Sequence, residues 1–330
     1  MSQLGKDEIM VSVIIPVFDR ADIISDALNS LVNQSYKHFE VVIVDDGSTD
    51  NLERVVTKYS DVLRIAYVKE SHSGNIAAVR NKGLSIAKGT YVAILDSDDV
   101  CAGTRFEKQL AYFENNTEAD ILASHAELFG NSDTKRHDFL QRLYNTDMST
   151  SEMIKRFLNY GCCLCHSTMM VRKKVLDTLS GYDESYSICE DYDIWMRAIV
   201  EGMNIAILPE KLVKRRLHND SVTNEYEGSE QAIRNVIRIK LSFLLKSGLI
   251  SGKKVAVLGV NKRNEYVKEC LSVHFDNRLH LDYLDIHNGL STAQLNKYSY
   301  YFVTTYSRKR EIFRLLQEYG RSIVKDYIYL

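Results

Sequence analysis

The sequence shows little excess charge of either sign. Its 330 residues include 42 Lys and Arg residues against 44 Asp and Glu residues, a formal net charge of −2. Proteins that bind nucleic acids or strongly anionic membranes commonly carry a clear positive excess. The charge balance therefore predicts no nucleic-acid partner.

The sequence also lacks a long apolar segment. No run reaches the roughly 18 apolar residues expected of a membrane span. The stretch from Gln3 to Glu8 is polar and does not resemble the start of a signal peptide. The six cysteines show no spacing typical of a disulfide framework. We therefore expect a cytoplasmic protein without a transmembrane segment, and leave peripheral contact with the inner face of a membrane open.

One cysteine motif needs to be excluded. The segment Cys162-Cys163-Leu164-Cys165-His166 contains the C-x-x-C-H pattern of c-type haem attachment. Haem attachment requires export, which the sequence does not predict, and no second cysteine pair has the spacing of a zinc site. The segment runs into residues 167–171, which have the composition of a buried strand, where free cysteines pack as small apolar side chains. We expect neither haem nor zinc.

The first hundred residues alternate between strand and helix patterns. Continuous apolar, β-branched runs predict buried strands, at 11–18, 39–44, 64–68 and 91–95. Apolar residues at helical spacing lie between them, including a helix at 75–87. This rhythm predicts an α/β fold with a mostly parallel central sheet flanked by helices.

The remaining chain suggests a second, smaller domain. Residues 101–225 are less regular, with helices expected at 104–116, 150–159 and 190–201. A connecting helix is expected within 226–250. Strand patterns at 255–258, 281–284, 300–304 and 327–330 alternate with helices, which predicts a small α/β domain over 251–330. Its first strand ends in a single glycine, Gly259, where the dinucleotide fingerprint needs three. Its role is left open, with docking, acceptor positioning and homo-oligomer formation as the alternatives.

Two acidic clusters follow predicted strands. Asp45-Asp46-Gly47 closes the second strand, and Asp96-Ser97-Asp98-Asp99 closes the fourth. Ligands of such sheets bind outside the carboxyl ends of the strands, so both clusters should line one crevice. Clustered carboxylates repel one another unless a cation lies between them, and hard oxygen ligands suit Mg²⁺ or Mn²⁺. An Asp can also accept a hydrogen bond from N3–H of uracil. The alternative is two solvated turns that cap the following helices.

The ordered set of motifs resembles a known family. The segments VSVIIPVFDR, VDDGSTD, SGNIAAVRNKGLSIAKGTYVAILDSDD and EDYDIWMRA are similar, in order and spacing, to those of family-two inverting glycosyltransferases with the GT-A fold. The resemblance covers residues 10 to about 225, which we expect to form the transferase domain. Residues 1–100 would form its nucleotide-sugar-binding half and residues 101–225 its acceptor and catalytic half.

The resemblance implies roles for particular residues on the donor side. Pro16, Val17 and Phe18 would lie under the nucleoside base, which Asp46 would read. Arg80 would lie near the base or the diphosphate. The remaining donor and metal residues would come from the acidic cluster and a late loop: Asp96 and Ser97 near the ribose, Asp98 as the main ligand of Mn²⁺ or Mg²⁺, and Asp99 and His218 as further ligands.

On the acceptor side, the resemblance implies that Asp191 is the general base. An inverting transfer is a single displacement, in which the acceptor hydroxyl loses a proton to a carboxylate as it attacks. Secondary candidates are Glu190, Trp195, His166 and Arg216. Two of them also have a plain structural alternative: an acid in the first turn of a helix for Glu190, a core aromatic for Trp195.

The implied function is transfer of a hexosyl or N-acetylhexosaminyl group from a UDP-sugar to a glycan or lipid-linked glycan acceptor, in the synthesis of a bacterial surface polysaccharide. A sugar nucleotidyltransferase and an inactive sugar-nucleotide-binding or scaffold protein are the alternatives. The former would be expected to carry a Gly-rich, basic loop after the first strand, where Pro16 to Arg20 stand instead.

Overall fold

A computed structural model describes most of the chain, in two compact units. The described residues are 10–131, 134–148, 152–154, 156–157, 161–218, 228–259, 261–275, 279–285, 292–305, 308–323 and 325–330. The first unit comprises Met1–Thr150 and Cys163–Glu225, and the second comprises Ser151–Cys162 and Tyr226–Leu330. Within the helix predicted at 150–159, the described residues 152–154 and 156–157 are helical.

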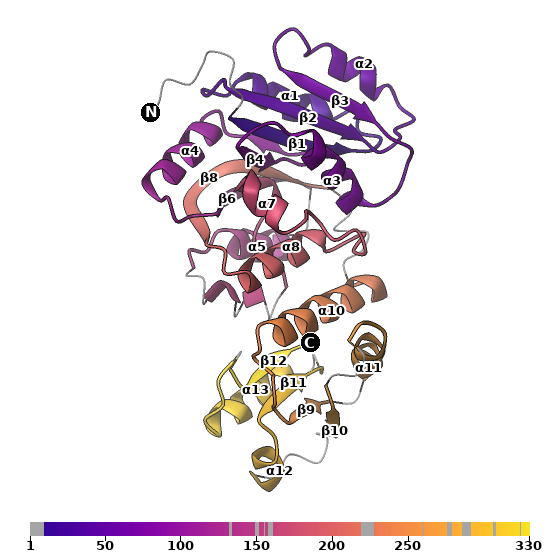
Figure 1. Cartoon of the computed structure of the whole chain (residues 1–330), viewed down its shortest axis with the longest axis vertical. Helices are drawn as coiled ribbons and strands as arrows, with labels where there is room; N and C mark the ends of the chain where they lie inside the picture. Colours follow the sequence, from indigo (N-terminus) through magenta and orange to yellow (C-terminus); the bar gives the residue numbers. More distant parts are fainter. Residues whose placement is uncertain are drawn as a thin grey trace. The chain divides into compact units, whose positions relative to one another are not determined.

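An eight-stranded sheet forms the centre of the first unit, in the order β3-β2-β1-β4-β7-β6-β8-β5 (Figure 1). Its strands are β1 (Val11–Val17), β2 (Phe39–Asp45), β3 (Ile65–Lys69), β4 (Tyr91–Ile94), β5 (Val100–Cys101), β6 (Ile121–Gly130), β7 (Met170–Arg172) and β8 (Ile205–Leu217). The four strands β3, β2, β1 and β4 run parallel, whereas β7 is antiparallel to both of its neighbours. The carboxyl ends of the parallel strands therefore share one edge of the sheet.

Helices cover the apolar strands. The helices of the first unit are α1 (Ile24–Val32), α2 (Leu52–Thr57), α3 (Ile76–Ile86), α4 (Arg105–Asn115), α5 (Thr134–Tyr144), α7 (Lys173–Thr178) and α8 (Glu190–Val200). All seven residues of β1 are buried, as expected of a central strand covered on both faces. Gly83 lets α3 approach β1 closely, because a Cβ atom there would lie 2.6 Å from Cγ2 of Ile14.

One short element differs from the expected strand at 167–171. His166–Thr168 form a 3₁₀ turn, η1, and the strand β7 begins only at Met170. Ser167 and Thr168 are buried, as the apolar pattern predicted, but Thr168 Oγ1 donates to the carbonyl of Cys165 and tightens the turn. Local hydrogen bonding by Ser and Thr thus competes with the strand ladder.

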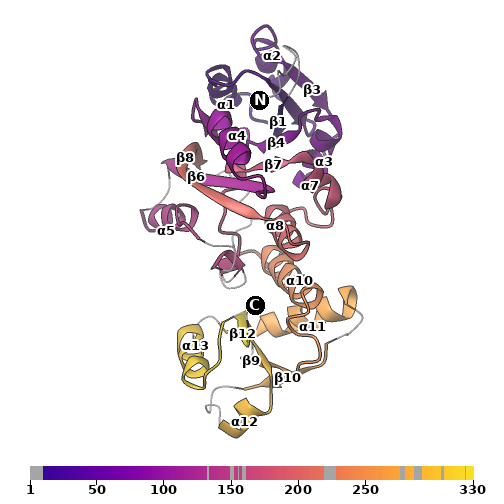
Figure 2. The same ribbon diagram turned by 60° about the vertical axis from the view of Figure 1, so that its left-hand side comes forward.

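The second unit contains a four-stranded parallel sheet in the order β10-β9-β11-β12 (Figure 2). Its elements are α10 (Glu230–Lys246), β9 (Val255–Leu258), α11 (Lys262–His274), β10 (Leu281–Leu284), α12 (Thr292–Asn296), β11 (Tyr300–Val303), α13 (Lys309–Glu318) and β12 (Tyr327–Tyr329). The small α/β domain expected from the sequence is confirmed. No helix in the described part of the chain is long and apolar enough to span a membrane.

Candidate active site

The loop after β2 connects three neighbouring strand ends through Asp46. Its backbone N–H donates to the carbonyl of Val17 at the end of β1, over 2.9 Å. Its carboxylate accepts hydrogen bonds from the backbone N–H and hydroxyl of Ser73, both at 2.8 Å, and from the N–H of Gly74 at 3.0 Å. Asp46 therefore orders the loop that follows β3, a structural task that the sequence did not predict for it.

Two aromatic rings form a small platform beside Asp46. The ring of Phe18 stacks on that of His72, with centroids 4.0 Å apart and an interplanar angle of 21°. Phe18 is 39% exposed, an unusual placement for a large apolar ring, and it can stack on a planar base. Val17 is buried within β1, as is Pro16, so these two residues support the platform rather than form its surface.

His72 is a site residue that the sequence reasoning missed. It follows β3, the one strand of the parallel set for which the sequence predicted no ligand-binding side chain at the carboxyl end. Its Nδ1 atom lies 2.9 Å from the carbonyl oxygen of Asp46. The close approach of the two loops requires Gly47, which has φ +82° and whose Cβ atom, if present, would lie 2.6 Å from the backbone nitrogen of His72.

The acidic cluster after β4 meets the end of β8. Oδ2 of Asp98 lies 2.7 Å from Nε2 of His218, so the two predicted metal ligands come together. Arg216 binds the same loop, donating from Nε to the carbonyl of Asp98 at 3.0 Å and from its backbone N–H to Oδ1 of Asp99 at 2.8 Å. Ser97 is buried in the turn between these acids.

Asp99 faces the protein interior. Its side chain is 1% exposed, and burial followed by repulsion from Asp98 and Asp96 raises its pKa well above the ordinary value. Oδ1 of Asp99 joins the turn after β4 to the backbone of Arg216, which gives this residue a structural role, and its role as a metal ligand stays a prediction. The guanidinium of Arg216 extends to Oδ2 of Asp26, at 2.5 Å.

Arg80 of α3 connects the donor side of the site to the start of α8. Its guanidinium donates to Oδ1 of Asp96 at 2.9 Å and to the carboxylate of Glu190. The side chains of Arg80 and Glu190 are 5% and 8% exposed. Burial raises the pKa of Glu190 to about 7, although Arg80 opposes the shift. The charges of Glu190 and Asp96 more than offset burial and raise the pKa of Arg80.

Asp191 lies beside this ion pair in the first turn of α8. The turn begins after Cys189, whose backbone has the left-handed φ of +66°. One carboxylate oxygen of Asp191 accepts from the N–H of Tyr192 at 2.7 Å. Burial raises the pKa of Asp191, and the charge of Arg80 partly opposes this. A carboxylate with a raised pKa holds protons more tightly and is a better general base near neutral pH.

Two of the secondary candidates belong to the core. Trp195 is fully buried, and its ring centroid lies 5.1 Å from that of His166. Nε2 of His166 lies 2.9 Å from the hydroxyl of Tyr182, and burial, with a smaller effect of Arg80, lowers the pKa of His166 well below its usual value. His166 is therefore neutral at physiological pH and packs behind α8, which supports the structural alternative for both aromatic residues.

The described residues offer a partial metal site. None of them form a group of three or more His, Cys, Asp and Glu side chains arranged to hold a metal ion. The pair Asp98 and His218 supplies one hard oxygen and one imidazole, a set that Mn²⁺ accepts. Such ions commonly bind through one or two protein groups and complete their coordination with substrate phosphates. The pair therefore fits an ion that is shared with a diphosphate.

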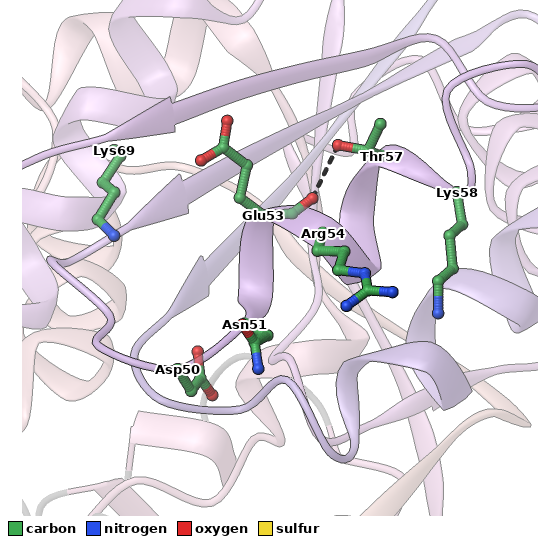
Figure 3. Close-up of a pocket in the computed structure, with 7 residues that line it drawn as sticks. All are labelled: Asp50, Asn51, Glu53, Arg54, Thr57, Lys58 and Lys69. Atoms are coloured by element: carbon green, nitrogen blue, oxygen red, sulfur yellow. Dashed lines mark hydrogen bonds between the residues drawn. The ribbon is translucent and has the colours of Figure 1, made fainter.

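A separate surface hollow lies between α2 and β3 (Figure 3). It is lined by Asp50, Asn51, Glu53, Arg54, Thr57, Lys58 and Lys69. None of these residues belongs to the site built above. Lys69 donates to the carbonyl of Ser48, at 2.7 Å, and so helps to hold the loop after β2. The hollow carries both charge signs, and we assign it no ligand.

Comparison with known proteins relates the chain to glycosyltransferases. It is 32% identical over 216 residues to an uncharacterized glycosyltransferase of Methanocaldococcus jannaschii, covering 64% of this chain and 72% of the relative. It is 28% identical over 268 residues to the Escherichia coli UDP-Glc:alpha-D-GlcNAc-diphosphoundecaprenol beta-1,3-glucosyltransferase WfaP, covering 80% of this chain and 96% of that protein.

Two solved structures share the fold. Residues 1–349 of Staphylococcus aureus TarS, in complex with UDP, superpose with a TM-score of 0.58 at 22% identity, covering 81% of this chain and 72% of that one. The mannosyltransferase PcManGT of Pyrobaculum calidifontis, with GDP-Man and Mn²⁺, superposes with a TM-score of 0.55 at 15% identity, covering 80% and 74%. These similarities confirm the GT-A type of fold expected from the sequence.

The sequence model of the family described as Glycosyl transferase family 2 matches residues 12–180, which include the loops of Asp46 and Asp98 and the helix of Arg80. The match spans more than half of the chain and agrees with the relatives, some of which act in polysaccharide biosynthesis. This protein is therefore a glycosyltransferase and belongs to glycosyl transferase family 2.

Proposed function

We propose that this chain transfers a sugar from a nucleoside-diphosphate donor, UDP-linked by preference, to an acceptor hydroxyl with inversion of the anomeric carbon. The observation that carries the proposal is the bridge made by Arg80. One buried guanidinium contacts Asp96 on the donor side and Glu190, the neighbour of Asp191, on the other. A donor-binding group and a proton acceptor are thus held in a single charge cluster.

The preference for uracil rests on the platform and on Asp46. Phe18 and His72 offer stacked rings to a planar base. The carboxylate of Asp46 already accepts three hydrogen bonds from the loop at 73–74, and Nδ1 of His72 lies 3.0 Å from its Oδ2. N3–H of uracil would take the place of the His72 contact, whereas cytosine has no proton there.

Asp98 and His218 would hold a divalent cation, Mn²⁺ or Mg²⁺. When bound, such a cation neutralises charge on a leaving diphosphate as a Lewis acid. The proposal is supported by the 2.7 Å approach of these two side chains and by the carboxylate of Asp96 two residues before Asp98. The PcManGT complex contains Mn²⁺ and has the same fold.

The displacement itself would use the residues of α8. The acceptor oxygen attacks the anomeric carbon on the face opposite the diphosphate, and the bond from that carbon to the diphosphate oxygen breaks with its electron pair. Asp191 takes the proton of the attacking hydroxyl. Arg80 pairs with Glu190 beside it, opposes the rise of the Glu190 pKa, and orients the start of the helix. We propose a glycan or lipid-linked glycan as acceptor, the class named for the Escherichia coli relative.

The test is a screen of nucleotide-sugars that identifies the released product. The transferase proposal expects nucleoside diphosphate, released only with Mn²⁺ or Mg²⁺ present, and no release by Asp98→Ala. Asp61→Ala is the matched control, because Asp61 is an exposed acid of the same unit. Release of pyrophosphate would instead indicate a nucleotidyltransferase. Full activity in excess chelator would contradict the role given to Asp98 and His218, and binding without turnover of any donor would indicate an inactive binding protein.

A further inference from the structure

The helix α5 carries a row of exposed side chains that the transferase site does not use. Lys135, Phe139 and Arg142 are four and three residues apart, so they lie on one face of the helix. All three are exposed, and we call them the α5 stripe. We propose that the α5 stripe docks the protein on a membrane surface that carries anionic lipids. The proposal goes beyond the glycosyl transfer proposed above and uses no residue of that site.

The opposite face of α5 fixes the helix to the first unit. Leu140 is buried and packs with Leu128 of β6 and Leu217 of β8, and Tyr144 is partly buried against the same cluster. Cζ of Arg215 lies 5.0 Å from the ring centroid of Tyr144. Because Leu140 and Tyr144 point inward, the α5 stripe on the other side of the helix points to solvent. Figure 2 shows α5 at the left margin of the first unit.

Phe139 is the apolar member of the α5 stripe. Its side chain is 54% exposed. Moving an aromatic ring from water into an apolar phase is favourable in proportion to the area that is buried. A single exposed apolar residue is common on protein surfaces, so the charges around Phe139 decide which partner fits it.

The charge of α5 is positive, whereas the whole chain has a formal net charge of −2. The helix contains three cations, Lys135, Arg136 and Arg142, against one acid, Asp138, a net of +2. Nε of Arg142 donates to the carbonyl of Asp138 at 3.1 Å, and the carboxylate of Asp138 lies 3.7 Å from Nδ1 of His137. Anionic headgroups attract such a surface, and an aromatic ring enters the boundary between headgroups and acyl chains. Charge complementarity therefore favours an anionic lipid surface as the partner.

The position of α5 suits a transferase whose acceptor is held in a membrane, an argument that rests on the lipid-linked acceptor proposed above. Gly130 at the end of β6 pairs with Leu217 at the end of β8, and the N–H of Asn131 donates to the carbonyl of Leu217 at 2.8 Å. His218 follows Leu217 directly, so the strand ends that lead to α5 and to His218 are neighbours. Docking through α5 would bring this end of the site and a lipid-linked acceptor to the same surface.

The composition of the α5 stripe predicts weak and reversible attachment. Each Lys or Arg near an anionic surface contributes a modest attraction, which falls off within a Debye length. One aromatic ring buries little area compared with a lipid chain. We therefore expect binding that added salt reverses.

The experiment is co-sedimentation of the full chain with large unilamellar vesicles, without donor or acceptor. One set contains phosphatidylcholine and phosphatidylglycerol in equal parts, and the other contains phosphatidylcholine alone. We expect binding to the anionic vesicles that weakens with added salt, and much weaker binding to the neutral ones. The partition coefficient should fall by about tenfold or more when Lys135→Gln and Arg142→Gln are combined, and by about fivefold in Phe139→Ser.

Two variants of the same unit serve as matched controls. Lys174→Gln removes an exposed lysine of α7, and Val62→Ser removes an exposed apolar side chain that follows an acid, Asp61. Both should bind the anionic vesicles as the wild type does. Far-UV circular dichroism of every variant should match the wild type, because all of the replaced side chains are exposed. The charge variant and Phe139→Ser test the α5 stripe independently of each other.

Absence of binding to the anionic vesicles at low salt would overturn the proposal, and so would stripe variants that bind as the wild type does. Equal binding to both vesicle types would contradict the role of the cations. A dimer that Phe139→Ser dissociates, detected by light scattering without vesicles, would assign the α5 stripe to a second copy of the chain instead. None of these outcomes bears on the glycosyl transfer proposal, because that test measures nucleotide release and uses a variant of Asp98.

Discussion

The two units place charged side chains beyond the carboxyl ends of parallel strands, but with different balance. In the first unit the buried Arg80 lies between Asp96 and Glu190, so that positive and negative charges compensate one another. In the second unit Lys240 faces Arg263 and Lys309, which repel it. The comparison teaches that burial alone does not define a site, since the buried Arg80 contacts two carboxylates whereas the buried Lys240 donates to a backbone carbonyl and is repelled by neighbouring cations.

The largest expected effect is on turnover, in the charged cluster of the first unit that contains Arg80, Glu190 and Asp191. Asp191→Asn keeps the size of the side chain but removes the proton acceptor, and a general base contributes about 10²- to 10⁴-fold to the rate. We expect kcat to fall by that factor while calorimetric donor affinity is unchanged. Glu201→Gln, at the exposed end of the same helix, should retain full activity. If Asp191→Asn keeps most of its turnover, Asp191 is not the general base and Glu190 becomes the candidate.

The next effect is on stability. Arg80→Met leaves Glu190 buried without its partner, and loss of one member of a buried ion pair typically costs about 3–5 kcal/mol. Urea unfolding of the first unit should therefore show a lower free energy of unfolding by about that amount. Lys88→Met serves as the control because Lys88 is exposed on the same unit. Unchanged stability would show that the pair contributes nothing net to the fold.

Nucleotide binding should respond to Asp46 more moderately. Asp46→Ala removes one charged acceptor from uracil, which should weaken UDP binding by about 1–3 kcal/mol. The same variant also loosens the loop at 73–74, so Ser73→Ala, which removes one loop bond and leaves the carboxylate, separates the two causes. Calorimetric titration of the wild type and of both variants with UDP and with CDP measures the two effects. Equal affinity of the wild type for the two nucleotides would refute base reading by Asp46.

The pH dependence of turnover should reflect the raised pKa of Asp191. Because only the ionised carboxylate accepts a proton, kcat should rise about tenfold per pH unit below the pKa and reach a plateau above it. Burial raises this pKa, so the rising limb should lie above the usual range of an aspartate. Initial rates at saturating donor across the pH range provide the measurement. A profile that is flat down to the range of an ordinary aspartate would argue against the assignment.

The smallest effect is expected for Lys240→Met, and it sharpens the comparison with Arg80→Met. Removing a buried cation that other cations repel should change the free energy of unfolding by no more than about 1 kcal/mol, the value of its lost hydrogen bond to Tyr329. The folded-state pKa of Lys240 lies below its unfolded value, so wild-type stability should rise with pH toward the unfolded pKa. The stability of Lys240→Met should not show this increase with pH. Lys246→Met, exposed on the same helix, is the control. A loss comparable to that of Arg80→Met would mean that Lys240 is compensated within the fold.

Much of the donor half could be predicted because its signals are local. The buried runs of β1, β2 and β4 are continuous and apolar, and the carboxyl ends of parallel strands must meet. The approach of Asp98 to His218 is different, since the two residues are 120 positions apart and the family resemblance alone suggested it. Neither the hydrophobic periodicity of the sequence nor the spacing of its motifs indicates that these two side chains lie close together.

The strands of the acceptor half could not be predicted in the same way. The strand β8 reads IAILPEKLVKRRL, in which charged residues interrupt the apolar pattern, and its pairing with β6 shifts register near His125. The burial of Asp99 and Trp195 depends on side chains that arrive from distant elements. Sequence pattern therefore indicated which residues could act, and tertiary packing decided which of them face the interior.

The contact between Gly47 and the backbone of His72 has a consequence for how this protein can vary. No side chain fits at position 47, so any substitution must displace the loop after β3 and, with it, the hydrogen bonds that Ser73 and Gly74 give to Asp46. Saturation mutagenesis should therefore find position 47 intolerant to substitution. By contrast, Val62 is exposed in the turn before β3 and should tolerate nearly every substitution. Tolerance to substitution in this part of the chain would then depend on how closely a residue approaches the main chain of a neighbouring loop, and not on its distance from the reacting sugar.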